Sequence, residues 1–259
     1  MLLSKFRDSI ENLTFPLNEL PNSLLLQEDQ SLTIYYAPFD YINLSAKIVI
    51  CGITPGLQQA QIALQNAQQQ LSINAPLDVI YKSSKETASF AGSMRNNLIR
   101  MLNYIELHEH LGIHSCKELF SSRKDLVHYT SVLRYPVFKD GKNYSGSTPK
   151  ILNSPLLRNV IEQYLGEELC QLPPDILYIP LGDSVADVLY FMADNGYIEH
   201  NQILAGMPHP SGANSERIAF FLGEKSEKSL SKKTNPAIIL DKKHRLLNTL
   251  MSFKLKTNK

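Results

Sequence analysis

Four short apolar runs alternate with segments of helical periodicity, and this alternation limits the folds open to the chain. The runs occupy residues 47–52, 126–133, 176–182 and 202–205. Continuous apolar runs of this length are typical of strands that are buried on both faces of a parallel sheet. Strands that alternate with helices build an α/β layer. The pattern therefore predicts an α/β fold around a mainly parallel, four-stranded sheet.

The size and cysteine content set outer limits. The 259 residues, 43% of them hydrophobic, suffice for a single domain over residues 1–259, with a lead-in over 1–46 and a helical C-terminal extension over 223–259. Three well-separated cysteines, Cys51, Cys116 and Cys170, offer neither a disulfide framework nor a four-cysteine metal or cluster site. With no apolar run as long as a membrane span, we expect a cytoplasmic monomer that binds no metal.

Charge is distributed unevenly along the chain. The formal net charge is only +1, but residues 223–259 carry ten Lys and Arg side chains against three acidic ones, so this segment has a charge of +7 and the remainder −6. A basic segment of this kind can contact a phosphate backbone. An amphipathic terminal helix with solvated lysines has the same composition. Charge alone leaves both interpretations open.

Residues 207–214, MPHPSGAN, are the first candidate site. They join an apolar run to a helical pattern over 215–222, so they form a strand-to-helix corner. Pro208 and Pro210 restrict the backbone on both sides of His209, and Ser211 can cap the following helix. A neutral imidazole held there can donate a hydrogen bond to an anion. The alternative is a stiff connection whose histidine faces solvent.

Three further segments are candidates. The turn Gly52-Ile53-Thr54-Pro55-Gly56 lies between a strand and a helix, where backbone N–H groups can bind an anion, although a plain turn has the same pattern. Phe90 precedes a helix that should begin near Ser93, and its ring either packs on that helix or faces a ligand. The polar loop 139–150 can touch a phosphate backbone or form a solvated hairpin.

Taken in order, GITPG, FAG, TSV and HPSGAN resemble the motifs of the uracil-DNA glycosylase superfamily, over roughly residues 47–222. The resemblance implies a three-layer α/β/α fold and a protein that flips a damaged base out of DNA and excises it without a cofactor. The iron-sulfur cluster of some members is not expected, because its cysteines are absent. The implied partner is DNA that contains a deaminated or otherwise damaged base.

The resemblance also implies a role for each motif. The first turn, with Gly52, Ile53, Pro55 and Gly56, would cradle the base, Phe90 would stack on it, and Ser131 would read its edge. His209 would stabilise the leaving anion, which makes it the main catalytic candidate. Thr54 is the second catalytic candidate. The DNA contacts would come from Ser211, Gly212, Ala213 and Asn214, where Ser211 holds a phosphate and Ala213 takes the wedge position.

Two residues depart from the family pattern. Thr54 stands where active relatives carry Asp or Asn, and a hydroxyl can orient water but cannot act as a general base near neutral pH. Ser131 stands where many relatives carry Asn, and it cannot make a two-point amide contact. Three readings follow: a base-excision glycosylase, a non-catalytic or differently specialised nucleic-acid-binding member of the fold, or a small-molecule hydrolase that uses Ser211 and His209.

Overall fold

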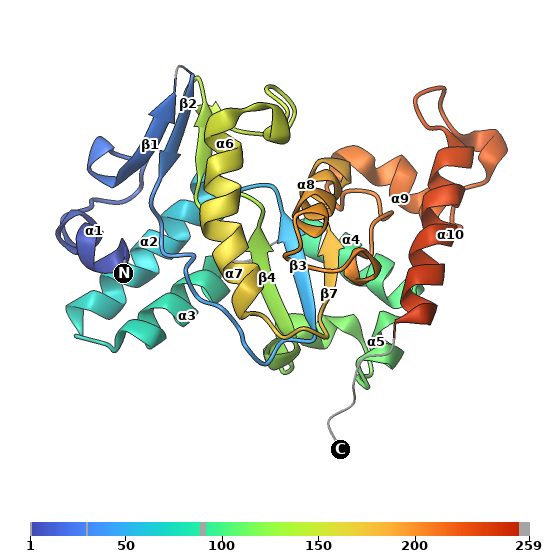
Figure 1. Ribbon diagram of the computed structural model, residues 1–259, viewed down its shortest axis with the longest axis horizontal. Coiled ribbons are helices and arrows are strands. Elements are labelled where there is room, and N and C mark those ends of the chain that lie inside the picture. The colour runs from blue at the N-terminus through green and yellow to red at the C-terminus, as the bar shows by residue number, and fades with distance from the viewer. Residues whose placement is uncertain (1, 30, 89–91, 254–259) are drawn as a thin grey trace. The chain divides into compact units, whose positions relative to one another are not determined.

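The computed structural model describes residues 2–29, 31–88 and 92–253, and the chain divides into two compact units (Figure 1). Unit 1 comprises Met1–Ile42, Ile53–Ser89 and Tyr129–Glu168. Unit 2 comprises Asn43–Gly52, Phe90–His128 and Leu169–Lys259. Each unit is therefore assembled from three separate stretches of the chain.

The parallel sheet contains three of the four apolar runs. Its strand order is β4 (Val127–Ser131), β3 (Ile48–Gly52), β7 (Leu177–Pro180). Strand β3 pairs in parallel with β7, so that Ile50 lies opposite Ile179. The four residues of β3 before Gly52 are all buried, as are all of β7. Burial of both faces explains why these runs are continuously apolar, and the mixed α/β class is confirmed.

The fourth predicted strand, residues 202–205, is reduced to one parallel bridge in the described chain. Ile203 lies opposite Tyr178, and the Leu204 N–H donates to the Tyr178 carbonyl oxygen at 2.8 Å. The side-chain amide of Gln202 donates to two backbone carbonyls, at 2.8 and 2.9 Å, and so ends the pairing on one side. On the other side Gly206, with φ of +132°, turns the chain away. The predicted parallel sheet had four strands, one more than the described residues form.

A second, antiparallel sheet was not predicted; of its strands the sequence indicates only residues 32–36, LTIYY, as a possible edge strand. Its order is β1 (Leu25–Asp29), β2 (Leu32–Tyr35), β5 (Val137–Lys139), β6 (Lys142–Asn143). Strands β5 and β6 form a hairpin whose turn, Asp140-Gly141, has positive φ at both residues. This geometry matches the twist of the flanking strands. The hairpin alternative for the polar loop is thus confirmed over β5 and β6.

Unit 1 places helices beside this sheet. Helix α2 (Leu57–Ser72) packs against α1 (Leu2–Glu11) and α3 (Leu77–Ala88), and the buried residues of α2 include three alanines that permit close approach. Helix α6 (Pro155–Val160) continues through a π-helical turn, Ile161–Leu165, into α7 (Gly166–Gln171). The described residues also form short 3-10 helices at Asn22–Leu24, Cys116–Phe120, Lys124–Leu126, Ile151–Asn153, His200–Gln202, Gly212–Asn214 and Glu227–Ser229.

Unit 2 contains α4 (Gly92–Tyr104), α5 (Leu107–His110), α8 (Asp183–Asp194), α9 (Ser215–Phe221) and α10 (Pro236–Ser252). Helix α10 packs against α9 (Figure 1) and buries Ile239, Leu246 and Leu250. The helix of the basic C-terminal segment is therefore amphipathic, and its apolar side packs against α9. No helix within the described ranges is long and apolar enough to cross a membrane.

A buried ionic network joins the three stretches of unit 1. Glu168 is fully buried and accepts hydrogen bonds from Arg134 Nε at 2.8 Å, while Arg134 Nη2 lies 2.7 Å from the same carboxylate oxygen. Lys85 Nζ lies 3.7 Å from the other oxygen of Glu168 and donates to the Tyr41 carbonyl oxygen at 2.7 Å. Burial lowers the pKa of Lys85 to about 8.

Asp40 extends this network. Its two carboxylate oxygens accept hydrogen bonds from the Tyr135 hydroxyl at 2.7 Å and the Tyr36 hydroxyl at 3.1 Å. Burial raises the pKa of Asp40, and the tyrosine bonds and the nearby Arg134 oppose that rise. Every charge in the network therefore has a partner, which is the condition for burying it.

Candidate functional site

The first glycine turn, residues 52–56, follows β3. Gly52 is the last residue of β3, in unit 2, and Ile53 to Gly56 belong to unit 1. The Ile53 carbonyl oxygen accepts a hydrogen bond from the Leu133 N–H at 2.9 Å. Ser131 is half-buried at the end of β4, two residues before Leu133. Ile53 of the turn and the residues that follow β4 therefore lie side by side in unit 1.

Thr54 uses its hydroxyl to hold the backbone. The hydroxyl donates to the Tyr135 carbonyl oxygen at 2.9 Å and accepts from the Val137 N–H at 3.0 Å. A hydroxyl has one proton to donate and two lone pairs. Because the proton and one lone pair are occupied, Thr54 can offer a water molecule only one acceptor site. Its evident task is to fix the start of β5 to the first glycine turn.

The hairpin also supports the start of α2, which sequence reasoning missed. Asn143 of β6 accepts the Leu57 N–H at 2.9 Å, and its amide lies 3.4 Å from the place where a side chain on Gly56 would begin. Gly146 has φ of +79°, and a Cβ at this position would lie 3.2 Å from the Ile53 side chain. Pro55, the residue between Thr54 and Gly56, is buried. In the sequence, the only indication of this contact was the polar loop 139–150, and no other segment of the chain was predicted to bind it.

His209 is held with one ring nitrogen facing the backbone. Its Nδ1 accepts the Ser211 N–H at 3.2 Å. Because Nδ1 acts as acceptor, the proton of the neutral ring is on Nε2, which becomes a donor. Burial lowers the pKa of His209, so the neutral form predominates at neutral pH. The half-buried ring is thus set up as a hydrogen-bond donor with no charge of its own.

Gly182 lets this ring approach the parallel sheet. It has φ of +99°, and the His209 Cβ and Cδ2 atoms lie 3.6 Å from where its own Cβ would be. Gly182 follows β7, and the Leu181 N–H donates to the Cys51 carbonyl oxygen at 2.9 Å, beside Gly52. Gly52 and His209 therefore share the carboxyl edge of the β3–β7 pair, the usual ligand-binding edge of α/β sheets. Sequence reasoning assigned no role to Gly182.

The residues after His209 form a short 3-10 turn. The Ser211 hydroxyl accepts from the Asn214 side-chain amide at 3.1 Å, and Asn214 Oδ1 accepts from Arg217 at 3.3 Å. The prediction that Ser211 caps the helix through its side chain is wrong, because its hydroxyl contacts Asn214 and no backbone N–H. Gly212 and Ala213 are exposed. The imidazole bonds the Ser211 N–H and not its hydroxyl, so the two do not form a nucleophile–base pair in this arrangement.

Helix α4 supports the same loop. It begins at Gly92, one residue before the predicted start, and its Asn97 side chain donates to the Pro210 carbonyl oxygen at 3.0 Å. Phe90, the predicted stacking residue, lies outside the described residues. Asn97 was missed because one asparagine on a helix face has no distinctive pattern in sequence.

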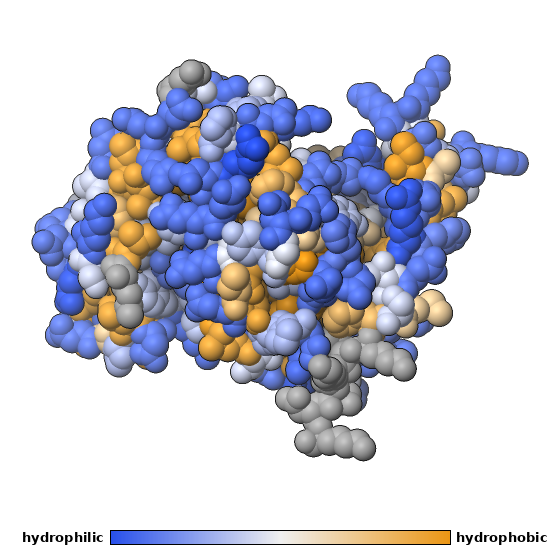
Figure 2. Space-filling model, viewed as in Figure 1, coloured by the Kyte–Doolittle hydropathy of each residue, from blue (hydrophilic) through white to orange (hydrophobic). Residues whose placement is uncertain are grey.

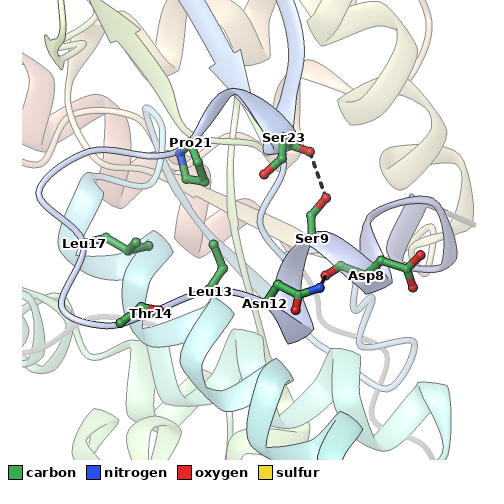
Figure 3. A pocket seen from close by; sticks show the side chains of 8 residues that line it. All are labelled: Asp8, Ser9, Asn12, Leu13, Thr14, Leu17, Pro21 and Ser23. Atoms are coloured by element: carbon green, nitrogen blue, oxygen red, sulfur yellow. Dashed lines mark hydrogen bonds between the residues drawn. The ribbon is translucent and has the colours of Figure 1, made fainter.

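Away from these loops, the described residues contain a cavity but no cluster of metal ligands. Within them, no three His, Cys, Asp or Glu side chains are grouped so as to hold a metal ion. Unit 1 has an open cavity of about 510 Å³ near its N-terminus (Figure 3). There the Ser9 hydroxyl donates to the Ser23 carbonyl oxygen and the Asn12 amide to the Asp8 carbonyl oxygen. None of the predicted site residues that the structure describes lines it; its walls are Asp8, Ser9, Asn12, Leu13, Thr14, Leu17, Pro21 and Ser23.

Comparison with known proteins gives a relative that matches nearly the whole chain. No family model matches the chain. No solved structure matches it significantly. The chain is 35% identical over 229 residues to an uncharacterized protein, YoxB, of Bacillus subtilis (strain 168), and the match covers 87% of this chain and 90% of YoxB. Similarity at this level over nearly the whole of both proteins establishes common descent, and the chain therefore belongs to the YoxB family.

Proposed function

We propose that the protein is a DNA glycosylase of the uracil-DNA glycosylase type, which flips uracil or another damaged base out of DNA and hydrolyses its N-glycosidic bond. In this proposal the three-stranded sheet and the bridge at Ile203 correspond to the four-stranded central sheet of that superfamily. The arrangement of His209 carries the proposal. A neutral ring with Nε2–H directed away from a backbone-bound Nδ1 suits an anion that appears during the reaction.

The reaction needs that donor at one stage. The bond between the sugar C1′ and the base nitrogen breaks, and its electron pair goes to the base. Water adds to C1′, and the proton that it loses is finally taken up by the base. Negative charge develops on the base as this bond breaks, so a donor at Nε2 of His209 would lower the barrier more than it stabilises the bound substrate. Because burial lowers the pKa of His209, the ring stays neutral at neutral pH and needs no carboxylate to balance a positive charge.

The assay is base release from single-stranded and duplex oligonucleotides that carry uracil, hypoxanthine, xanthine or a thymine mismatch. Loss of one such donor typically costs about 10²- to 10³-fold in rate, so His209→Ala should reduce release by that factor. His200→Ala is the matched control, because His200 is exposed and paired with Asp194 at 2.9 Å. Equal rates in wild type and His209→Ala would contradict the assigned role.

One observation favours a second candidate function, a nucleic-acid-binding member of the same fold without base-excision activity. The Thr54 hydroxyl is engaged by two backbone groups, which leaves little capacity to position water. Such a protein would bind these oligonucleotides and release no base from any of them. The same assay, combined with a binding measurement, separates the two functions.

A further inference from the structure

One carboxylate anchors the segment that joins α9 to α10. Glu216, in the first turn of α9, accepts hydrogen bonds from Lys225 Nζ at 2.8 Å and from the Ser231 N–H at 3.1 Å. It also accepts from the hydroxyls of Ser231, at 2.6 Å, and Thr234. The Lys225 ammonium and the two hydroxyls hold the pKa of Glu216 well below its usual range. We call Glu216 with Lys225, Ser231 and Thr234 the Glu216 clamp.

The clamp brings two lysines close to the His209 loop. Lys232 and Lys233 are the two residues between Ser231 and Thr234, so each is one peptide unit, about 3.8 Å between Cα atoms, from an anchored residue. Glu216 itself is two residues beyond Asn214, which contacts Ser211. The basic pair is therefore tethered at the end of α9 that adjoins the proposed DNA contacts.

Lys232 and Lys233 have no ionic partner among the described residues, unlike Lys225, Lys242 and Arg245 of the same segment. Lys242 pairs with Asp183 at 2.6 Å, Arg245 pairs with Asp241, and Lys243 donates to Tyr104 and to the Phe221 carbonyl oxygen. Lys232 and Lys233 are exposed. Figure 2 shows long hydrophilic side chains that extend from the part of unit 2 that contains the α9–α10 connection. The charges of these two lysines are thus exposed and form no ion pair with a described residue.

The surrounding composition favours a nucleic acid over a membrane. Between Gly223 and Asn235 the only aliphatic side chain is Leu230. Peripheral membrane binding uses an apolar face in addition to positive charge, and this segment has none. A phosphate backbone needs only well-placed cations and backbone or hydroxyl donors.

We propose that Lys232 and Lys233 bind the phosphate backbone of the nucleic-acid strand whose base reaches the His209 loop, and that Glu216 is a positioning residue that orders them. The inference rests on the proposed function for its substrate class. Ordering before binding reduces the entropy lost when the lysines meet the strand. The clamp thus gives Glu216, an acidic residue of α9, a role in holding the basic segment that follows.

The test is the salt dependence of binding to an undamaged oligonucleotide, followed by fluorescence anisotropy with the full chain. The slope of log K against log salt is negative, and each lost phosphate contact reduces its magnitude by about 0.7 to 0.9. Lys232→Ala/Lys233→Ala should therefore reduce the slope by about 1.4 to 1.8, and the double Arg replacement should restore it. Lys5→Ala/Lys82→Ala, which removes two exposed lysines of unit 1, should leave it unchanged.

Glu216→Gln separates positioning from simple charge. Removal of a negative charge beside a polyanion site would raise affinity if only net charge mattered. Loss of order would lower affinity, which is the expected result. An increase would overturn the positioning role.

Base release does not enter the binding measurement, so the two proposals fail separately. An unchanged slope in Lys232→Ala/Lys233→Ala overturns the inference even if the protein is a glycosylase. A reduced slope supports it even if no base is released. Binding to phosphatidylserine vesicles through these lysines, without binding to oligonucleotides, would also overturn it.

Discussion

Replacement of Glu168 by Gln should strongly destabilise the protein. Glu168 is fully buried between Arg134 and Lys85, which are themselves buried, so the neutral amide leaves two cations without their anion. A charge pair about 4 Å apart is worth about 4 kcal/mol at an effective dielectric constant of 20. Measured losses on breaking buried ion pairs are about 3 to 5 kcal/mol. Both routes give the same magnitude.

This loss is measurable by urea and thermal denaturation followed by circular dichroism. For a chain of this size 1 kcal/mol corresponds to about 2 to 4 °C in Tm, so Glu168→Gln should lower Tm by roughly 6 to 20 °C. Glu162→Gln is the matched control on the neighbouring π-helical turn, because Glu162 is exposed and should change stability by less than about 0.5 kcal/mol. A loss below about 1 kcal/mol for Glu168→Gln would refute the view that this carboxylate neutralises two buried cations.

Three further outcomes are expected. Lys85 has a pKa of about 8 in the folded protein against an ordinary value of 10.5, so the unfolded chain binds more protons between these two pH values. The free energy of unfolding should therefore rise between about pH 8 and pH 10, by up to about 1.4 kcal/mol per pH unit. Urea titrations of Lys85→Met should show no such rise. If base release needs neutral His209, its rate should be flat above pH 6.5 and fall through a pKa below that value, whereas a rate that rises on acidification would contradict the donor role. Gly206→Ala would place a Cβ 2.5 Å from the Lys242 carbonyl oxygen at a φ of +132°, which should cost roughly 2 to 6 kcal/mol in thermal denaturation, while Gly212→Ala, with open space around it, should cost far less.

The parallel strands and most long helices were predictable from sequence because their signals are local. A buried parallel strand is continuously apolar, and a helix that packs on one side repeats every three to four residues. The antiparallel sheet lacks such signals: β1 reads LLQED, and β5 has three residues. Its pairing of β2 with β5 joins segments about a hundred residues apart, which no local pattern encodes.

The candidate site divides in the same way. The motif containing His209 marks the loop, but the direction of its ring proton depends on the Ser211 N–H, which only the folded backbone reveals. The resemblance likewise points to position 54, yet the engagement of the Thr54 hydroxyl arises from contacts with residues more than eighty positions away. Lys85 lies on an otherwise ordinary amphipathic helix, where a lysine normally reads as solvated, so its burial was invisible in sequence.

The division into two units also determines when the protein can fold during synthesis. The chain passes from one unit to the other five times, after residues 42, 52, 89, 128 and 168. On the ribosome unit 1 cannot close its buried ionic network until Glu168 has emerged, and β3 must wait for β7. Folding of an N-terminal domain ahead of the rest is therefore closed to this chain, and long loops must be ordered before their contacts form. Because each unit is built from three stretches of the chain, no single proteolytic cut can release either unit intact.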